Sequence, residues 1–178
     1  MTYDGQATEN EWELLLGFIV ILDDQGDGYR GGYLCTREDG SPVEFHYTEP
    51  VSPTRSQELL YGKTLRPQLL GKHIAGSLME GTKERPDAII TENMHVLAGF
   101  EGDEIPVFCL CSEENEIPEG PNCKEVRNGS GSVVICWKSK GGEPEVLEEI
   151  KGIDIQEPLE RARSVLKEMG EGAFVEEG

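Results

Sequence analysis

Four of the five cysteines lie close together in the second half of the chain, at Cys109, Cys111, Cys123 and Cys136. Four thiolates form the ligand set of many structural zinc sites. One residue separates Cys109 from Cys111, and on a strand this spacing puts the two side chains on one face, about 6 to 7 Å apart. Zinc knuckles instead bring their sulfurs together through a turn with two intervening residues. We therefore predict small buried side chains and no bound metal, with zinc as the alternative.

A second candidate group comprises Cys35, Glu44 and His46, which the Asp39-Gly40 hairpin signal brings onto one face of two paired strands. An imidazole beside a thiol can activate it as a nucleophile. In the predicted register Cys35 and His46 form a diagonal pair about 7 to 8 Å apart at Cα. The sequence offers no third group to orient the imidazole, so these residues are weak catalytic candidates, and an ordinary solvated sheet face is the favoured interpretation.

Acidic side chains form a third group, at Asp23, Asp24 and Asp27. Closely spaced carboxylates can bind Mg²⁺ or Ca²⁺ through hard oxygen ligands. This segment lacks the twelve-residue pattern of an EF-hand loop and its final bidentate glutamate. A solvated turn is therefore the favoured interpretation.

Asp87 and Glu92 flank a short apolar segment and supply the main alternative function. A metal-dependent hydrolase or nuclease could use Asp87, Glu92 or His46, whereas a pocket beyond Thr91 could bind a small molecule. The sequence contains none of the common glycine-rich nucleotide-binding, nucleophile-elbow or zinc-protease motifs. We therefore predict no cofactor and favour a protein that is not an enzyme.

These residues depend on an N-terminal antiparallel meander for their positions. Apolar and β-branched residues predict strands over 14–22 and 29–37, joined by a turn over 23–28. The two-residue turn Asp39-Gly40, with Glu38 opposite Ser41, leads into a third strand. The predicted core face carries Leu34, Thr36, Val43, Phe45 and Tyr47, and the opposite face carries Tyr33, Cys35, Glu44 and His46.

Helices and further strands follow the meander. Capping residues and glycines predict helices over 55–61 and from Pro67 to Gly81. Apolar segments predict strands over 87–91, 105–111 and 132–138, a helical turn over 93–98, a surface loop over 112–131, and a helix over 157–169. The predicted fold class is α+β or α/β: a mixed sheet with an N-terminal antiparallel β-meander, two to three packing helices and a C-terminal helix.

The net charge of −19, from 35 acidic and 16 basic residues, guides the prediction of partners. Nucleic acid rewards clustered Lys and Arg, so we predict no direct binding of nucleic acid. A basic protein surface is the favoured partner, and Glu113, Glu114 and Glu116 are the expected contacts. The predicted function is a non-enzymatic protein-interaction or accessory subunit of a bacterial intracellular complex.

The expected domain organisation is a flexible N-terminus (1–10), one globular domain (11–170) and an acidic tail (171–178). No segment is apolar enough to span a membrane or to act as a signal peptide, so we expect a cytoplasmic protein, and an odd number of cysteines predicts free thiols rather than disulfides. The segments Gly31–Leu34, Asp39–Phe45, Thr48–Val51 and Leu59–Gly62 resemble a bacterial family without assigned function, over roughly the first half of the chain. That resemblance implies no activity, cofactor or site residue.

Overall fold

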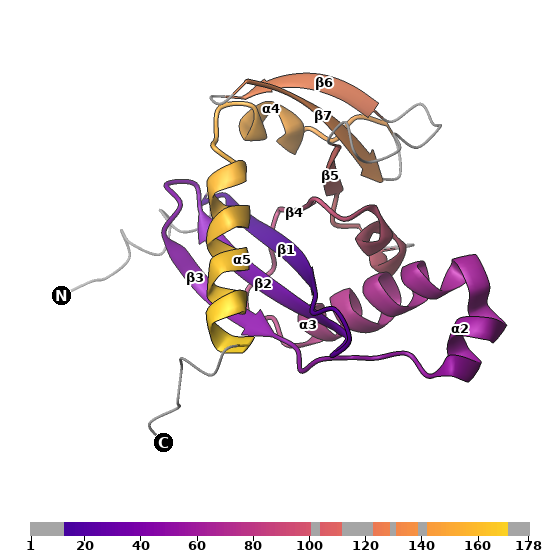
Figure 1. Cartoon of the computed structure of the whole chain (residues 1–178). Helices are drawn as coiled ribbons and strands as arrows, with labels where there is room; N and C mark the ends of the chain where they lie inside the picture. Colours follow the sequence, from indigo (N-terminus) through magenta and orange to yellow (C-terminus); the bar gives the residue numbers. More distant parts are fainter. Residues whose placement is uncertain (1–12, 101–103, 112–122, 129–130, 139–141, 171–178) are drawn as a thin grey trace.

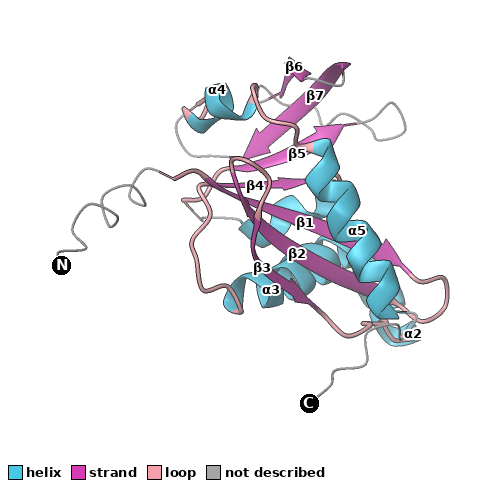
Figure 2. Cartoon of the chain, turned by 90° about the vertical axis from the view of Figure 1, so that its left-hand side faces the viewer, coloured by secondary structure: helices cyan, strands magenta, loops and turns pink. Residues whose placement is uncertain are grey.

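The computed structural model describes residues 13–100, 104–111, 123–128, 131–138 and 142–170. These residues form a mixed sheet with helices on both faces (Figures 1 and 2). The antiparallel meander at the start and the long helix at the end confirm the predicted fold class. No helix in the described part of the chain is long and apolar enough to cross a membrane.

The sheet comprises seven strands, β1 (Leu15–Asp23), β2 (Tyr29–Arg37), β3 (Pro42–Tyr47), β4 (Ala88–Thr91), β5 (Val107–Cys111), β6 (Cys123–Asn128) and β7 (Gly131–Lys138). Their order across the sheet is β3-β2-β1-β4-β5-β7-β6. Strands β1, β4 and β5 are parallel, so their carboxyl ends point toward the same edge of the sheet. The remaining neighbours pair antiparallel.

Helix α5 (Gln156–Gly170) covers one face of β1 and β2, and α4 (Val146–Ile150) adds to the same core. The helix carries Leu159, Ala162 and Leu166 at helical spacing, and all three are fully buried. They meet Phe18 and other strand residues of the same face. Each buried leucine or phenylalanine stabilises the fold by about 1.5 to 3 kcal/mol.

Three helical segments cover the opposite face: the π-helix η3 (Pro67–Ala75), α3 (Gly76–Glu80) and the 3₁₀ segment η4 (Met94–Phe100). Their apolar side chains pack on Ile19 and Tyr33 of the sheet. Gly71 of η3 and Gly99 of η4 approach so closely that a Cβ on either would collide with the backbone of the other segment. The two segments are therefore packed backbone against backbone.

Helix α2 (Arg55–Tyr61) and the 3₁₀ turn η2 (Gly62–Thr64) precede η3, and we call residues 55–75 the helical arm. Ser52 and Thr54 were both candidate caps for α2, and Thr54 is the cap: its Oγ1 accepts from Gln57 N at 3.2 Å, and Gln57 Oε1 accepts from Thr54 N at 2.9 Å. None of the residues of α2 is buried. Figure 1 shows this helix at the outer end of the arm.

The β2–β3 hairpin has the predicted register along most of its length, with Cys35 opposite Glu44. The turn itself differs from the prediction, because Arg37 N, and not Glu38, faces Ser41 and donates to its carbonyl oxygen at 2.9 Å. A three-residue loop followed by a register shift replaces the two-residue turn. Such loops are the next most common hairpin connection, and the shift adds one residue to the outgoing strand.

The prediction that one face of this hairpin is solvated is wrong. Tyr33 and Cys35 are fully buried, since η3 and α3 cover the face that was expected to be polar. The register shift turns Val43 toward this second cluster and away from the predicted core face. Tyr47, expected in the core, is 47% exposed.

Two elements of the second half were not predicted. Strand β6 lies inside the segment 112–131 that was expected to be loop, and α4 precedes the long helix. The expectation of mostly free thiols and no disulfide is wrong on the second point, because Cys136 is disulfide-bonded. The Cα of Cys136 pairs with that of Cys109 across β5 and β7 and with that of Cys123 across β6 and β7.

Candidate functional site

The cysteines proposed as zinc ligands meet where β5 and β7 pair. Cys109 and Cys136 are Cα partners, and Cys111 Sγ lies 3.4 Å from Cys136 Sγ. A disulfide-bonded sulfur is not a thiolate ligand, and burial raises the pKa of the Cys109 thiol to about 12. Within the described ranges no three His, Cys, Asp or Glu side chains are grouped to hold a metal ion. The zinc alternative therefore has no support from these residues.

The Cys35, Glu44 and His46 group does not form a nucleophilic site. Burial raises the pKa of the Cys35 thiol to about 11, so the nucleophilic thiolate is disfavoured. His46 Nε2 lies 3.2 Å from Glu44 Oε2, and the His46 ring stacks on Tyr33. Glu44 also accepts from the backbone N of Lys83 at 3.1 Å. These groups tie β3 to the turn after α3, which is a structural role.

The acidic turn after β1 is likewise occupied by structural bonds. Asp24 forms a bidentate pair with the buried Arg30, whose Nη1 donates to Leu166 O of α5 at 2.8 Å. The hydrogen bonds from this guanidinium hold the pKa of Asp24 below its usual value. Asp23 Oδ1 accepts from Gln25 N at 3.1 Å. Through Arg30, these bonds connect the turn after β1 to the last part of α5.

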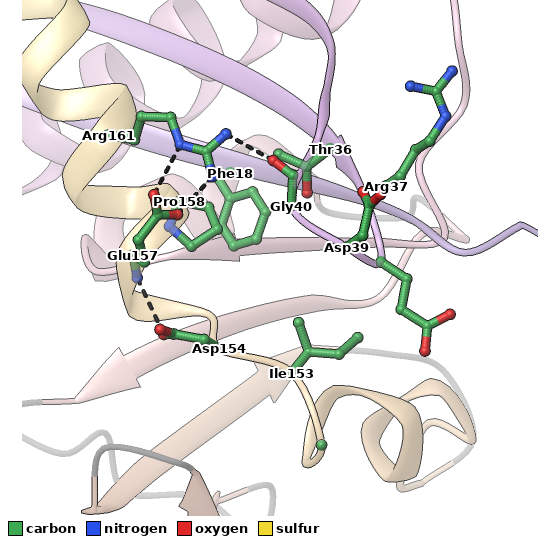
Figure 3. Close-up of a pocket in the computed structure, with 12 residues that line it drawn as sticks. Phe18, Thr36, Arg37, Asp39, Gly40, Ile153, Asp154, Glu157, Pro158 and Arg161 are labelled. Atoms are coloured by element: carbon green, nitrogen blue, oxygen red, sulfur yellow. Dashed lines mark hydrogen bonds and ion pairs between the residues drawn. The ribbon is translucent and has the colours of Figure 1, made fainter.

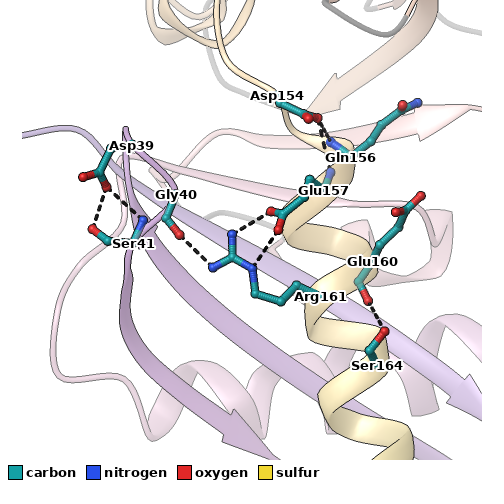
Figure 4. Close-up of polar contacts among 9 residues, drawn as sticks. All are labelled: Asp39, Gly40, Ser41, Asp154, Gln156, Glu157, Glu160, Arg161 and Ser164. Atoms are coloured by element: carbon teal, nitrogen blue, oxygen red, sulfur yellow. Dashed lines mark hydrogen bonds and ion pairs between the residues drawn. The ribbon is translucent and has the colours of Figure 1, made fainter.

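A pocket of about 490 Å³ lies between the β2–β3 hairpin and the start of α5 (Figure 3). Several of its polar groups bond to one another or to neighbouring backbone groups, as Figure 4 shows. Arg161 donates to Glu157 Oε2 at 2.6 Å and to Gly40 O at 2.7 Å, and Asp154 Oδ1 accepts from Gln156 N at 3.1 Å. Because these bonds fasten the hairpin to the helix, we do not assign this pocket a ligand.

The carboxyl end of β4 brings together polar residues from three layers of the fold. Glu92 directly follows the strand and forms an ion pair with Arg163 of α5. The next residue, Asn93, precedes η4, and its Oδ1 accepts from His95 N at 3.0 Å. Burial, and secondarily the positive charge of Arg66 in the helical arm, lower the pKa of His95. Arg163, on one face of the sheet, thus pairs with Glu92, and Arg66, on the helical side that covers the other face, contributes to the lowered pKa of His95.

The hydrolase or nuclease alternative named Asp87, Glu92 or His46 as its residues, and of these Glu92 lies at this end of β4. Asp87 lies at the opposite end of β4, about 16 Å away along the strand, and its Oδ2 accepts from Leu15 N at 2.9 Å. His46 lies three strands away from β4. The structure therefore does not bring the three residues together.

A divalent cation does not fit the described side chains at this edge. Residues 15–22 of β1 are all apolar or glycine, and Ile19 is level with Thr91, so Asp23 lies about 10 Å beyond the level of Glu92. Glu92 itself is already paired with Arg163. One paired carboxylate is too few for a site that usually needs several oxygen ligands.

The helical arm has a charge opposite to that of the protein as a whole. Residues 55–75 contain four basic residues and one acidic residue, hence +3 in a chain of −19, so all other residues together carry −22. The acidic residue, Glu58, pairs with Arg55 at 3.2 Å. Lys63, Arg66 and Lys72 are exposed and form no salt bridge within the described ranges. Counting charges segment by segment would have found this cluster in the sequence.

The glutamates predicted to bind a partner, Glu113, Glu114 and Glu116, lie outside the described residues. Their proposed role rested on the net charge of the whole chain. Net charge is a sum, and a sum conceals a local cluster of opposite sign.

Comparisons with protein-family models and with curated proteins give no match. Solved structures do share the fold. Endonuclease V of Ciona intestinalis, in complex with a 23mer DNA that contains an inosine followed by a ribo-adenosine, has a TM-score of 0.55 at 10% identity, covering 95% of this chain and 100% of that one. Human ENDOV has a TM-score of 0.49 at 9% identity, covering 91% and 87%. Argonaute of Marinitoga piezophila, in complex with 5' OH guide RNA, has a TM-score of 0.44 at 11% identity, covering 85% and 29%.

The likeness to the Ciona intestinalis structure overturns two predictions from the sequence. The prediction of a non-enzymatic protein-interaction subunit is wrong, because the shared fold is that of an endonuclease and favours the nuclease-type alternative. The prediction that nucleic acid is not a direct partner is wrong on the same finding, since that endonuclease was solved with DNA. At 10% identity the likeness establishes the fold alone: this chain has the fold of endonuclease V.

Proposed function

We propose that this chain binds nucleic acid, with the strand lying along the helical arm toward the carboxyl end of β4. The proposal rests mainly on the charge of the arm, because residues 55–75 have a formal net charge of +3 in a chain whose net charge is −19. Lysine and arginine side chains that contact phosphates release condensed counterions, which is the main source of affinity for nucleic acid without sequence specificity. The acidic remainder of the surface would confine the strand to this arm.

The position of the arm adds to the argument. Residues of η3, which begins directly after Arg66, pack against η4, which begins just beyond the end of β4, and the charge of Arg66 contributes to lowering the pKa of His95 in η4. In open sheets with parallel strands, ligands commonly bind beyond the carboxyl ends of those strands. The similar fold of an endonuclease bound to DNA supports the same choice of ligand.

Hydrolysis, the nuclease-type alternative that the fold favours, is tested separately from binding. Glu92 is the acidic residue immediately at this strand end, and it forms an ion pair with Arg163. Within the described ranges no three His, Cys, Asp or Glu side chains are grouped to hold a metal ion. Incubating a labelled strand with the protein and Mg²⁺ or Mn²⁺ tests cleavage, and a product lost in Glu92→Gln would replace the binding proposal with a hydrolytic one.

Fluorescence anisotropy with labelled oligonucleotides tests the proposal itself. Without sequence specificity we expect a dissociation constant of about 1 to 100 μM near physiological salt. Three phosphate contacts on a single strand predict a roughly 20-fold loss of affinity between 50 and 200 mM salt. Binding that does not depend on salt would contradict the proposed role of the arm.

A matched pair of double variants separates local charge from net charge. Lys63→Gln with Arg66→Gln removes two positive charges from the arm, and should lower the slope of log K against log salt by about 1 to 1.5. Lys83→Gln with Lys167→Gln changes the net charge equally at exposed positions outside the arm. Equal effects of the two variants would refute a binding surface on the arm.

A further inference from the structure

The outer end of the helical arm exposes three consecutive large side chains, Leu59, Leu60 and Tyr61, which we call the apolar tip. Their exposed fractions are 67%, 83% and 44%. They lie on α2, none of whose residues is buried, so no contact within the described fold explains them. Single apolar residues on a surface are ordinary, but three of the four exposed large apolar side chains in the described part of the chain lie on this one short helix, at Leu59, Leu60 and Tyr61.

Resting on the proposed function, we propose that the apolar tip contacts unpaired bases and that the ligand is therefore a single strand. In a duplex the faces of the bases are stacked on one another, and only their edges are accessible in the grooves. A single strand presents both phosphates and base faces, and proteins that bind single strands combine a basic surface with apolar and aromatic side chains.

The arm offers these two kinds of contact side by side. Tyr61 is followed two residues later by Lys63 and five residues later by Arg66, and both basic residues are exposed. A strand that lays its phosphates on the basic residues can turn its bases toward the tip. A single strand of nucleic acid complements both the basic residues and the apolar tip, whereas a purely apolar partner would leave the positive charges unmatched.

A hollow of about 260 Å³ beside Tyr61 can take the edge of a base. Gln57, Gln68 and His73 line it together with apolar side chains such as Leu69. Amide and imidazole groups can donate to and accept from the hydrogen-bonding edge of an unpaired base.

The test compares a 16-nucleotide single strand with the duplex of the same sequence, using the full chain and anisotropy at one salt concentration. We expect at least 10-fold tighter binding of the single strand. Tyr61→Ser should weaken binding of the single strand about 10-fold, the usual effect of losing one stacked base, and leave the salt slope unchanged. Tyr61→Phe should restore the affinity.

Tyr47→Ser is the control, since Tyr47 is exposed to a similar degree, 47%, on the sheet's meander and outside the arm. Circular dichroism of each variant confirms that it is folded. Equal or tighter binding of the duplex, or a Tyr61→Ser variant with unchanged affinity, would overturn this inference and leave the proposed function standing. Absence of binding to either nucleic acid would overturn the proposed function.

Discussion

Replacing Gly71 by alanine should lower the free energy of unfolding, although alanine normally stabilises a helix. A Cβ at this position would lie 2.9 Å from the backbone N of Gly99 and 3.0 Å from Cβ of Ala98, and would overlap the carbonyl oxygen of His95. Backbone atoms of a packed segment cannot move aside as the end of a flexible side chain does. Overpacking typically costs about 1 to 3 kcal/mol, and contact with backbone atoms places this site near the upper end.

The matched control is Gly76→Ala in the same helical region. Gly76 has helical φ of −58°, and a Cβ there meets nothing within 4 Å. Alanine gains about 1 kcal/mol over glycine at either position. The expected net effects are a loss of about 2 kcal/mol for Gly71→Ala and a gain of up to about 1 kcal/mol for Gly76→Ala.

Thermal unfolding followed by circular dichroism measures the difference. One kcal/mol shifts the midpoint by about 2 to 4 °C in a domain of this size, so the two variants should differ by about 6 to 12 °C. If Gly71→Ala were as stable as Gly76→Ala, η3 and η4 would not be packed backbone against backbone. The packing that brings the helical arm up to η4 would then lose its basis.

Two further predictions concern Asp24 and the cysteines. The hydrogen bonds from Arg30 lower the folded-state pKa of Asp24, so its contribution to stability is complete above the unfolded value near 4 and is lost as pH falls through the folded value. Urea unfolding should therefore show Asp24→Asn less stable than the parent by about 2 kcal/mol at pH 7, with a gap that closes below pH 4; a gap independent of pH would contradict the pair. In native protein at pH 8, iodoacetamide labelling read by mass spectrometry should modify the partly exposed Cys111 before the buried Cys35 and Cys109, and rapid labelling of Cys35 would restore it as a candidate nucleophile.

Local sequence signals predicted most of the first half of the fold. The strand over 29–37, the helix over 55–61 and the pairing of Cys35 with Glu44 follow from alternation, capping and turn chemistry, all of which act over a few residues. The faces of the hairpin were harder, because burial of Tyr33 depends on η3, which comes 34 or more residues later in the chain. Local sequence patterns thus predicted these strands and helices, but not which helices bury the faces of the strands.

The candidate site was predictable only in part, for the same reason. Glu92 was a candidate from its place after a strand, but its partner Arg163 lies 71 residues away on α5. Asp87 and Glu92 looked related in sequence, yet a four-residue strand holds them at opposite ends. Pairings between distant segments are set by the topology, and one sequence read by itself does not contain them.

The distribution of charge decides how the endonuclease V fold can be used by this chain. All residues outside the arm together carry −22, so under the proposed function a strand approaches along Lys63 and Arg66 of the arm. At the end of β4, Glu92 forms an ion pair with Arg163 of α5. This pair reduces the repulsion that an unpaired carboxylate would exert on the phosphates of a strand bound at this edge. Under the proposed function, Arg163→Gln should therefore weaken binding of a strand.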